Sequence, residues 1–334
     1  MKAYQVKEYN DNASFVETEL DKPSIQPGHV LVKVRATSLN PVDHKILTGD
    51  VGFNPDLPAV LHMDVSGVVV EIGQGINQFN IGDEVYGCAG GLQGNNGKLE
   101  GALADYMLVD AQLIAHKPKT LGLIEAAALP LVSITAWEGL FDRANIQKND
   151  HVLIHAGTGG VGHIAVQLAK QHGAKVATTI SSEEKSKMAQ QLGVDEVINY
   201  KKESVANYVE RLTQNKGFDV VYDTLGESNL DRSLEAARIN GQVISTVGVN
   251  THDLSPMHVK GLTLHLVFML LPMITGIGRS HHGHILAQIA KMVDEGNIVP
   301  LIHEKRFLFN QVNQAHALFA SGQHVGKILL ENDS

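Results

Sequence analysis

Three glycines, at positions 157, 159 and 162, are the residues whose type and spacing point most directly to chemistry. They follow a short apolar run at 152–154, and residues 164–169 then continue at helical spacing. In a strand–turn–helix unit of this kind, the first glycine allows a tight turn, the second lets the backbone approach a pyrophosphate, and the third lets helix and strand pack closely. Glycine-rich turns also arise for steric reasons alone, but the flanking strand and helix favour a dinucleotide site. The residues predicted to bind the cofactor phosphates at the helix start are Gly157, Thr158, Gly159, Gly160, Val161 and Gly162.

The residues after the next predicted strand, 175–180, bear on which dinucleotide binds. An acidic residue there binds the 2′-hydroxyl of NAD, whereas neutral and cationic groups admit the 2′-phosphate of NADP. The chain has Ser181 and Ser182 at this point, and Lys185 follows. Ser181 and Glu184 also match the S-x-x-E capping box of a helix start, where an anion would bind equally well. The pattern favours NADPH over NADH, although the adjacent glutamates place negative charge nearby.

The elements that position these residues alternate between strands and helices from about residue 129 to residue 274. Most of the strands are nearly continuous apolar runs, as expected when a parallel sheet is covered on both faces. The expected strands are 152–155, 175–180, 196–199, 218–222, 242–247 and 262–269. This pattern predicts an α/β domain built on a parallel sheet.

The N-terminal third of the chain has a β character instead. Residues 29–36 alternate apolar and charged side chains, and further short strands are expected at 65–73 and 83–87. Short strands with frequent turns suggest a small barrel. A helix at 311–320 and a closing strand at 326–330 return to mixed structure at the C-terminus. We therefore predict two domains, one formed by residues 1–128 and completed by 275–334, the other by residues 129–274.

Composition excludes several classes of protein. The net charge is −9 and no basic block is present, so neither nucleic acid nor an anionic membrane is an expected partner. The single cysteine, Cys88, rules out an intramolecular disulfide. The start of the chain has no apolar run suited to a signal peptide. Residues 261–277 are apolar but short for a membrane span, and we interpret them as a buried strand and its exit. We expect a cytoplasmic protein.

Seven segments together resemble a known family along nearly the whole chain. They are 27–32, 38–43, 64–69, 156–162, 181–185, 197–200 and 220–226. On these segments the chain resembles the zinc-free medium-chain dehydrogenase/reductases, and among them the NADPH quinone oxidoreductases of the zeta-crystallin type. The resemblance implies a GroES-like β-barrel catalytic domain beside a Rossmann domain with a doubly wound parallel sheet, and an active site in the cleft between them. It also implies a homodimer, often formed by pairing the last strands of two Rossmann sheets.

The resemblance implies roles for individual residues as well. Those near the adenosine 2′-phosphate would be Ser181, Ser182, Lys185 and Tyr200. Those near the nicotinamide would be Thr135, Val247, Gly248 and Phe268. Asn40 and Asp43 would line the substrate side. Structural roles compete with these assignments: Asn40 and Asp43 could hold the turn at Pro41, Thr135 could bond back to its own helix, and Tyr200 could cover the sheet edge.

A zinc site of the kind found in related alcohol dehydrogenases is not expected. Those relatives need a thiolate or carboxylate in the first segment and a Gly-His-Glu in the next. Here the first position holds Asn40, and Met63 stands where the ligand histidine would be. Zinc in proteins prefers imidazole, thiolate and carboxylate over amide and thioether.

Two groups of histidines could form an improvised metal site, and we expect neither to do so. One comprises His62, His44 and Asp64. The other is the cluster at 280–284, which we place in a glycine-bounded loop. With 17 histidines in the chain, local clusters arise without a purpose.

Without a Lewis acid, alcohol oxidation loses its usual means of forming an alkoxide, whereas an electrophilic acceptor needs less help. We therefore expect hydride transfer from NADPH to a small electrophile, either a quinone or the β-carbon of an α,β-unsaturated carbonyl compound. Hydrogen-bond donors, with Asn40 a candidate and His44 a weaker one, would stabilise the acceptor oxygen, and water would supply the proton. A zinc alcohol dehydrogenase, a non-enzymatic NADPH-binding protein and an enoyl-thioester reductase of the same superfamily remain alternatives.

Overall fold

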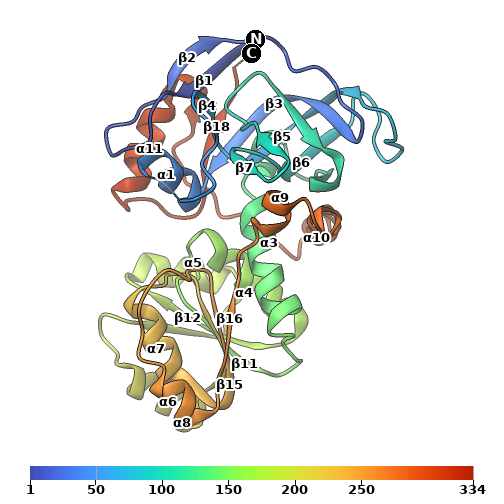
Figure 1. Cartoon of the computed structure of the whole chain (residues 1–334). Helices are drawn as coiled ribbons and strands as arrows, with labels where there is room; N and C mark the ends of the chain where they lie inside the picture. The colour runs from blue at the N-terminus through green and yellow to red at the C-terminus, as the bar shows by residue number, and fades with distance from the viewer. Residues whose placement is uncertain (50, 334) are drawn as a thin grey trace. The chain divides into compact units, whose positions relative to one another are not determined.

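The computed structural model describes residues 1–49 and 51–333, which form two compact units. The first unit comprises Met1–Leu131, Leu270–Gly296 and Pro300–Ser334, so the chain leaves it and later returns. The second comprises Val132–Met269 and Asn297–Val299. In Figure 1 the blue and red parts of the chain belong to the first unit, and the green to orange parts form most of the second.

A six-stranded parallel sheet forms the centre of the second unit. Its strand order is β13-β12-β11-β14-β15-β16, and every neighbouring pair is parallel. The strands are β11 (His151–Ile154), β12 (Lys175–Ile180), β13 (Glu196–Asn199), β14 (Phe218–Asp223), β15 (Ala237–Ser245) and β16 (Thr263–Leu266). Numbered within the sheet, this order is 3-2-1-4-5-6, that of a doubly wound Rossmann fold. The order reverses between β11 and β14, and ligands bind at the carboxyl ends of strands at such a point.

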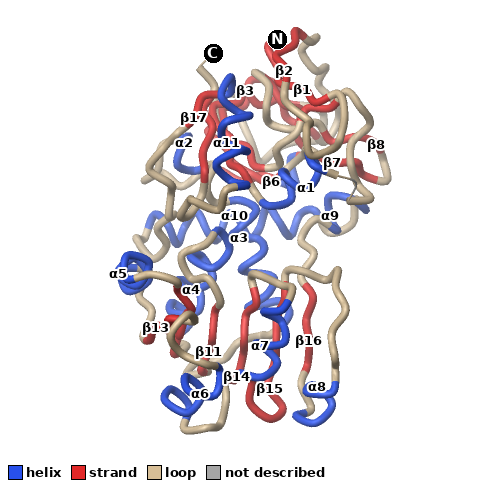
Figure 2. The backbone as a smooth tube through the Cα atoms, turned by 90° about the vertical axis from the view of Figure 1, so that its left-hand side faces the viewer, coloured by secondary structure: helices blue, strands red, loops and turns tan. Residues whose placement is uncertain are grey.

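Five helices connect these strands: α4 (Gly160–His172), α5 (Glu183–Gln191), α6 (Val205–Thr213), α7 (Ser228–Ala236) and α8 (Ser255–Lys260). Before β11 come α3 (Pro130–Trp137) and the π-helix η2 (Glu138–Arg143). Figure 2 shows α7 between β14 and β16, with α6 and α8 at the lower end of the sheet.

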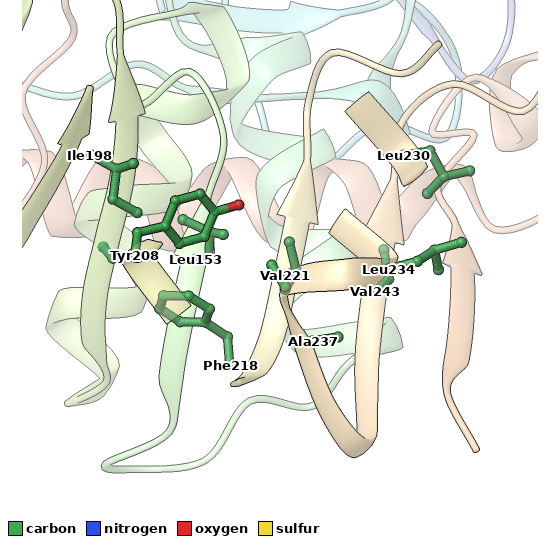
Figure 3. Packing of buried hydrophobic residues seen from close by; sticks show 11 residues of the cluster. Leu153, Ile198, Tyr208, Phe218, Val221, Leu230, Leu234, Ala237 and Val243 are labelled. Carbon is green, nitrogen blue, oxygen red and sulfur yellow. The ribbon is translucent and has the colours of Figure 1, made fainter. Parts of the chain in front are cut away.

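An apolar core fixes the sheet against α6 and α7 (Figure 3). Leu153 and Val221 project from neighbouring strands, and Tyr208 and Leu234 meet them from the two helices. Burying one such side chain stabilises the fold by about 1.5–3 kcal/mol. This packing holds the carboxyl ends of β11 and β14 in place, where the glycine turn begins.

The first unit is mainly antiparallel sheet. Its largest sheet has the order β10-β6-β5-β3-β18-β17, with β9 also pairing with β3; a second has the order β2-β1-β4, and β7 pairs with β8. The strands are β1 (Lys2–Val6), β2 (Val16–Glu19), β3 (His29–Leu39), β4 (Ala59–Val60), β5 (Asp64–Ile72), β6 (Glu84–Cys88), β7 (Leu92–Gly94), β8 (Gly97–Leu99), β9 (Tyr106–Asp110), β10 (Ile114–His116), β17 (Phe307–Leu308) and β18 (Ile328–Glu331). The helices are α1 (Pro41–Thr48), η1 (Ala111–Leu113), α2 (Leu123–Ala126), α9 (Leu271–Thr275), α10 (Arg279–Asp294), η3 (Phe309–Gln311) and α11 (Val312–Ala320).

Two sequence-based expectations about elements are wrong. The strand expected at 262–269 ends at Leu266, because the chain turns away after β16. The histidines at 280–284 do not lie in a loop but in the first turns of α10. Gly283 is helical, and a Cβ there would lie 2.7 Å from the carbonyl oxygen of Gln112. This glycine therefore serves the close packing of α10 rather than a turn.

One helical stretch, Leu123–Arg143, is long and apolar enough to span a membrane by length and composition. However, 72% of its most apolar window is buried inside the protein, as in the core helix of a globular domain.

Candidate active site

The glycine turn between β11 and α4 is packed so tightly that a side chain does not fit at two of its positions. A Cβ on Gly162 would overlap the carbonyl oxygen of Ala156 and lie 3.0 Å from the Cα of Gly157. A Cβ on Gly157 would overlap the hydroxyl of Thr178 on the neighbouring strand. Both positions therefore require glycine, as a dinucleotide turn predicts.

The start of α4 is open to an anion. Its N-cap is Gly159, which offers no side chain to accept hydrogen bonds from the first turn. Gly159, Gly160 and Val161 are partly exposed, whereas Thr158 is buried. Unpaired N–H groups at a helix start, together with the helix dipole, bind phosphate. The turn therefore fits the pyrophosphate of a dinucleotide.

A cavity of about 690 Å³ lies in the second unit at the carboxyl ends of the strands. His155 and Thr179 line it from the ends of β11 and β12, Tyr200 follows β13, and Leu225 follows β14. Tyr200 is 48% exposed and Leu225 is 51% exposed, so both present apolar surface to a ligand. A cavity of this size at the switch point of the sheet is suited to half of a dinucleotide.

Of the four residues expected beside the 2′-phosphate, the structure places one in the wall of the cavity. Tyr200 lines the cavity, whereas Ser181, Ser182 and Lys185 do not. Ser182 is the N-cap of α5, and its hydroxyl accepts a hydrogen bond from the backbone N–H of Lys185 at 3.3 Å. The capping box predicted for Ser181 and Glu184 is therefore wrong by one residue, because α5 begins at Glu183.

Thr135, expected beside the nicotinamide, is buried in α3. Its carbonyl oxygen accepts a hydrogen bond from the hydroxyl of Tyr222 at 2.7 Å. The helix then continues as the π-helix η2, where a Cβ on Gly139 would lie 2.5 Å from the Tyr222 hydroxyl. Burial raises the pKa of Tyr222, so its hydroxyl remains a donor to this carbonyl.

Three other residues predicted at the nicotinamide end follow the last two strands of the sheet. Val247 and Gly248 come after β15, and Phe268 comes after β16 and is about half-exposed. The Ser245 hydroxyl fixes this bend by accepting a hydrogen bond from the backbone N–H of Val247 at 3.3 Å. Because the sheet is parallel, these residues share the edge that carries the glycine turn.

In the first unit, Asn40 and Asp43 are buried and already engaged. The side-chain amide of Asn40 donates to Asp64 at 2.8 Å, and its oxygen accepts from the ammonium of Lys327. Asp43 accepts hydrogen bonds from the backbone N–H groups of Asn40, at 2.8 Å, and of Met63, at 3.1 Å. This pair holds the start of α1 at Pro41, as the structural alternative for these residues predicts.

Lys327 is the cation of this buried network. It is 2% exposed, and its ammonium donates to the carbonyl oxygen of Leu39 at 3.0 Å and lies 3.6 Å from a carboxylate oxygen of Asp64. Burial lowers the pKa of Lys327 while the carboxylates of Asp64 and Asp43 oppose that shift. Burial, with the charge of Asp64, raises the pKa of Asp43 to about 7.

This network does not fit a zinc ion. The two positions that would supply ligands hold Asn40 and Met63, and the Asn40 oxygen is already bonded to the ammonium of Lys327. Amide and thioether are poor zinc ligands, and a second cation would be repelled by the ammonium. Within residues 1–49 and 51–333 there is no group of three or more His, Cys, Asp or Glu side chains arranged to hold a metal.

Three histidines form a hydrogen-bonded chain in the first unit, and no pattern in the sequence indicates that all three lie together. His316 on α11 lies between the other two: its Nδ1 is 3.2 Å from Nδ1 of His44, and its Nε2 is 2.9 Å from Nε2 of His62. Phe15 packs against His62 and His316 with ring centroids 6.0 and 5.0 Å away. Because His316 uses different nitrogens for its two neighbours, the three rings do not converge on one point.

We expect this chain of imidazoles to make the protein sensitive to acid. Burial lowers the pKa of His316 to about 3 and that of His62 well below 6.5. Histidines with a lowered folded pKa contribute stability that is present above pH 6.5 and is lost as the pH falls below it. His316→Gln should therefore lose about 2 kcal/mol less of its free energy of unfolding between pH 7 and pH 5 than the wild type. Urea unfolding at the two pH values measures this difference, and parallel losses would contradict the assignment.

Cys88 is fully buried, and its sulfur lies 3.9 Å from the sulfur of Met273. Burial raises the pKa of its thiol well above the usual value. A buried thiol of raised pKa packs as a small apolar side chain.

Comparison with known proteins agrees with this architecture. Residues 26–119 match the family model described as the alcohol dehydrogenase GroES-like domain, and residues 160–276 match the model described as zinc-binding dehydrogenase. The chain is 32% identical to a 2-methylene-furan-3-one reductase of Solanum lycopersicum, over 99% of this chain and 79% of that protein. It is 30% identical to the chloroplastic NADPH-dependent alkenal/one oxidoreductase of Arabidopsis thaliana, with the same coverage. It is 28% identical to a quinone oxidoreductase of Rattus norvegicus, over 94% of this chain and 92% of the relative.

Solved structures give the same result. An alcohol dehydrogenase superfamily protein from Novosphingobium aromaticivorans is 37% identical with a TM-score of 0.93, covering 99% of each chain. Mycobacterial Rv1454c, solved in complex with NADPH, is 26% identical with a TM-score of 0.84, again over 99% of each chain. A GroES-like unit joined to a Rossmann unit defines a two-domain class of oxidoreductases. The chain belongs to the medium-chain dehydrogenase/reductase family, and the predicted family and fold class are confirmed.

Proposed function

We propose that this protein is an NADPH-dependent reductase of α,β-unsaturated carbonyl compounds and quinones that works without a metal ion. The observation that carries the proposal is the glycine turn at 157–162, which leaves no room for a Cβ at two positions and lies at the switch point of a Rossmann sheet. The NADPH-dependent relative and the NADPH-bound neighbour support the choice of nucleotide. We assign cofactor binding to the second unit, predicted from sequence as 129–274, and the catalytic domain to the first.

The residues present fit the cofactor along the carboxyl edge of the sheet. The turn would hold the pyrophosphate, and the cavity with Tyr200 would take the adenosine half, with Ser181, Ser182 and Lys185 nearby for the 2′-phosphate. The residues assigned to the nicotinamide half are Thr135, Val247, Gly248 and Phe268. When bound, NADPH supplies the hydride that reduces the acceptor.

Reduction of an enone needs a hydride at the β-carbon, a proton at the α-carbon, and stabilisation of the negative charge that develops on oxygen. The protein contributes by aligning the reactants and offering hydrogen-bond donors, while water supplies the proton. We assign Asn40 and Asp43 to positioning, because their side-chain polar atoms hold the turn at Pro41 and the Asp64–Lys327 network. An enone is favoured over a quinone because two of the relatives at 30% identity or above are named 2-methylene-furan-3-one reductase and NADPH-dependent alkenal/one oxidoreductase, whereas the rat quinone oxidoreductase is 28% identical.

We also propose a cytoplasmic homodimer. β16 is an edge strand of the sheet; its last residue, Leu266, and Phe268 just after it are about half-exposed. Exposed apolar residues next to an unpaired strand edge favour pairing with a second copy. The single cysteine, which allows no intramolecular disulfide, agrees with a reducing compartment.

The proposed activity is tested by following NADPH and NADH oxidation with a panel of enones, quinones, aldehydes and CoA-linked enoyl thioesters. We expect NADPH to be consumed with enones and quinones and little or no turnover of simple alcohols with NADP. Selective turnover of the thioesters would identify the enoyl-thioester alternative. Tight NADPH binding with no turnover of any acceptor would identify a non-enzymatic binding protein.

Lys185 provides a test of nucleotide choice. Lys185→Ala removes a cation at the start of α5, close to where the 2′-phosphate would bind. We expect the KM for NADPH to rise about tenfold or more, because a charge-assisted hydrogen bond contributes about 1.5–3 kcal/mol, and the KM for NADH to stay unchanged. Lys187→Ala, on the same helix but with an exposed side chain, is the matched control. Equal effects on the two nucleotides would remove Lys185 from phosphate recognition.

A further inference from the structure

The helical segment that precedes the parallel sheet changes its winding at one point. After Trp137, α3 gives way to η2, where the backbone N–H of Ala144 donates to the carbonyl oxygen of Gly139, five residues earlier, at 3.0 Å. Turns of π-helix are rare and are frequently found at functional sites. The chain therefore adopts an uncommon backbone geometry just after Thr135, the residue of α3 assigned to the nicotinamide half.

A tyrosine of the sheet holds the helix at this point. The hydroxyl of Tyr222 donates to the carbonyl oxygen of Thr135 at 2.7 Å. In a regular α-helix that carbonyl would accept from the N–H of Gly139. Gly139 also makes room for the phenol, because a Cβ there would lie 2.5 Å from the hydroxyl oxygen and 2.6 Å from the ring carbon that bears it. A side chain that enters the ladder of helical hydrogen bonds distorts the helix, so Tyr222 and Gly139 together account for the junction of α3 and η2.

The hydroxyl of Tyr222 has a fixed orientation and takes no part in proton transfer. Tyr222 is fully buried, and burial raises the pKa of its phenol, so the hydroxyl keeps its proton. That single proton is donated to the Thr135 carbonyl, and the side chain exposes no surface to a substrate. Its contribution is therefore to position the helix.

The backbone of Tyr222 is tied to the strand that leads into the glycine turn. Tyr222 lies on β14 opposite Ile154 of β11, and its carbonyl oxygen accepts a hydrogen bond from the backbone N–H of His155 at 2.9 Å. Its side chain reaches Thr135 on α3. One residue thus connects the strand that ends at the pyrophosphate turn with the helix that carries Thr135, and it sets the distance between them.

We propose that Tyr222 is a positioning residue for hydride transfer, which holds Thr135 at the height where it meets the nicotinamide. This inference rests on the proposed function, which assigns Thr135 to that half of the cofactor. A misplacement of about 1 Å can lower the rate of an enzymatic step about 100-fold. Loss of this hydrogen bond therefore lowers turnover, while the affinity for NADPH, which depends mainly on the glycine turn, changes little.

A second buried tyrosine provides a matched control. Tyr86 is also fully buried, and its hydroxyl donates to a helix carbonyl, that of Leu286 on α10, at the same distance of 2.7 Å. It lies in the first unit, and no role in cofactor binding is assigned to it. Tyr222→Phe and Tyr86→Phe each remove one buried hydrogen bond and keep the ring, so we expect similar falls in melting temperature.

The test measures kcat with an α,β-unsaturated ketone, the Kd for NADPH and the melting temperature of both variants. We expect Tyr222→Phe to lower kcat about tenfold or more and to leave the Kd within about threefold of the wild type. Tyr86→Phe should keep the wild-type kcat. A wild-type kcat in Tyr222→Phe, or equal falls of kcat in the two variants, would overturn the inference.

A double-mutant cycle tests whether Tyr222 acts through Thr135. Thr135→Ala should lower kcat, and adding Tyr222→Phe to it should lower kcat no further, because the residue to be positioned has lost its contact. Losses that multiply would show that Tyr222 acts independently of Thr135, and would overturn the inference while leaving the proposed function intact. Failure of the wild-type protein to oxidise NADPH with any acceptor would overturn the proposed function itself.

Discussion

Gly162→Ala abolishes measurable NADPH binding if the turn at 157–162 holds the pyrophosphate. The added Cβ would overlap the carbonyl oxygen of Ala156 and stand 2.8 Å from its carbonyl carbon. Both obstacles are backbone atoms, so no change of rotamer removes them. The start of α4 must move away from β11, and the N–H groups that face the phosphates move with it. We expect the Kd for NADPH to rise at least a hundredfold and the free energy of unfolding to fall by about 1–3 kcal/mol.

Two further glycine variants complete this experiment: Gly159→Ala separates binding from stability, and Gly49→Ala is the control. Gly159 has φ −87°, and the nearest atom to a Cβ there is 3.1 Å away, so Gly159→Ala should fold with little loss of stability. Its methyl group would still occupy the space where the backbone approaches a phosphate, and NADPH binding should weaken. Gly49→Ala, with open space around the added Cβ, should change neither binding nor stability. Normal affinity in Gly162→Ala, measured by isothermal titration, would remove the turn from the cofactor site.

Of the charged-residue substitutions that we propose, we expect Lys327→Met to lower the free energy of unfolding the most. It leaves the stem of the side chain but removes the only cation beside the buried carboxylate of Asp64 among the described residues. Breaking a buried ion pair by removing one partner costs about 3–5 kcal/mol. Asp64 keeps hydrogen bonds from Ser38, Asn40 and the backbone of Leu131, which offset part of that cost and place the expected loss at the lower end of this range.

A double-mutant cycle separates this charge effect from loss of packing. Asp64→Asn added to Lys327→Met removes the unpaired charge, and we expect part of the lost stability to return. Lys291→Met provides the control, since Lys291 is exposed and its pairing with Glu295 is a surface contact worth less than 1 kcal/mol. Urea unfolding measures the free energy of unfolding of the wild type, of Lys327→Met, Asp64→Asn and the double variant, and of the Lys291→Met control. Additive losses in the cycle would show that Lys327 and Asp64 do not interact energetically.

The second unit could be predicted from sequence because its signals are local. The strands expected at 175–180 and 196–199 coincide with β12 and β13, since each is a short run bounded by clear turn residues. The glycine turn is contiguous in sequence for the same reason. One local signal gave a wrong prediction. Ser181 matches a capping box, but Ser182 is the N-cap of α5. The exact end of a helix depends on the backbone angles of a single residue, which the sequence pattern does not determine.

The buried networks of the first unit could not be predicted, because their members are far apart in sequence. His316 meets His62 across 254 positions, and Lys327 reaches Asn40 across 287. No spacing rule links α11 to the loop before β5, or the residue before β18 to the residue before α1.

His62 illustrates why a residue's neighbours matter more than its type. It was considered as a metal ligand with His44 and Asp64, but its ring nitrogen faces His316 instead. Its backbone is in the left-handed region, with φ +73°, a conformation that costs a non-glycine residue energy. The hydrogen bond to His316 and the contact with Phe15 are two interactions that favour the buried ring despite this cost.

We propose that NADPH, bound through its pyrophosphate at 157–162, delivers a hydride to a conjugated acceptor without a metal ion. The most direct test uses dialysed wild-type protein, NADPH with deuterium at both C4 positions and an α,β-unsaturated ketone, with metal content determined on the same sample. We predict deuterium at the β-carbon of the product, one NADPH consumed per ketone reduced, and a rate that chelators leave unchanged. Unlabelled product, or a rate that rises and falls in proportion to bound zinc, would contradict the account.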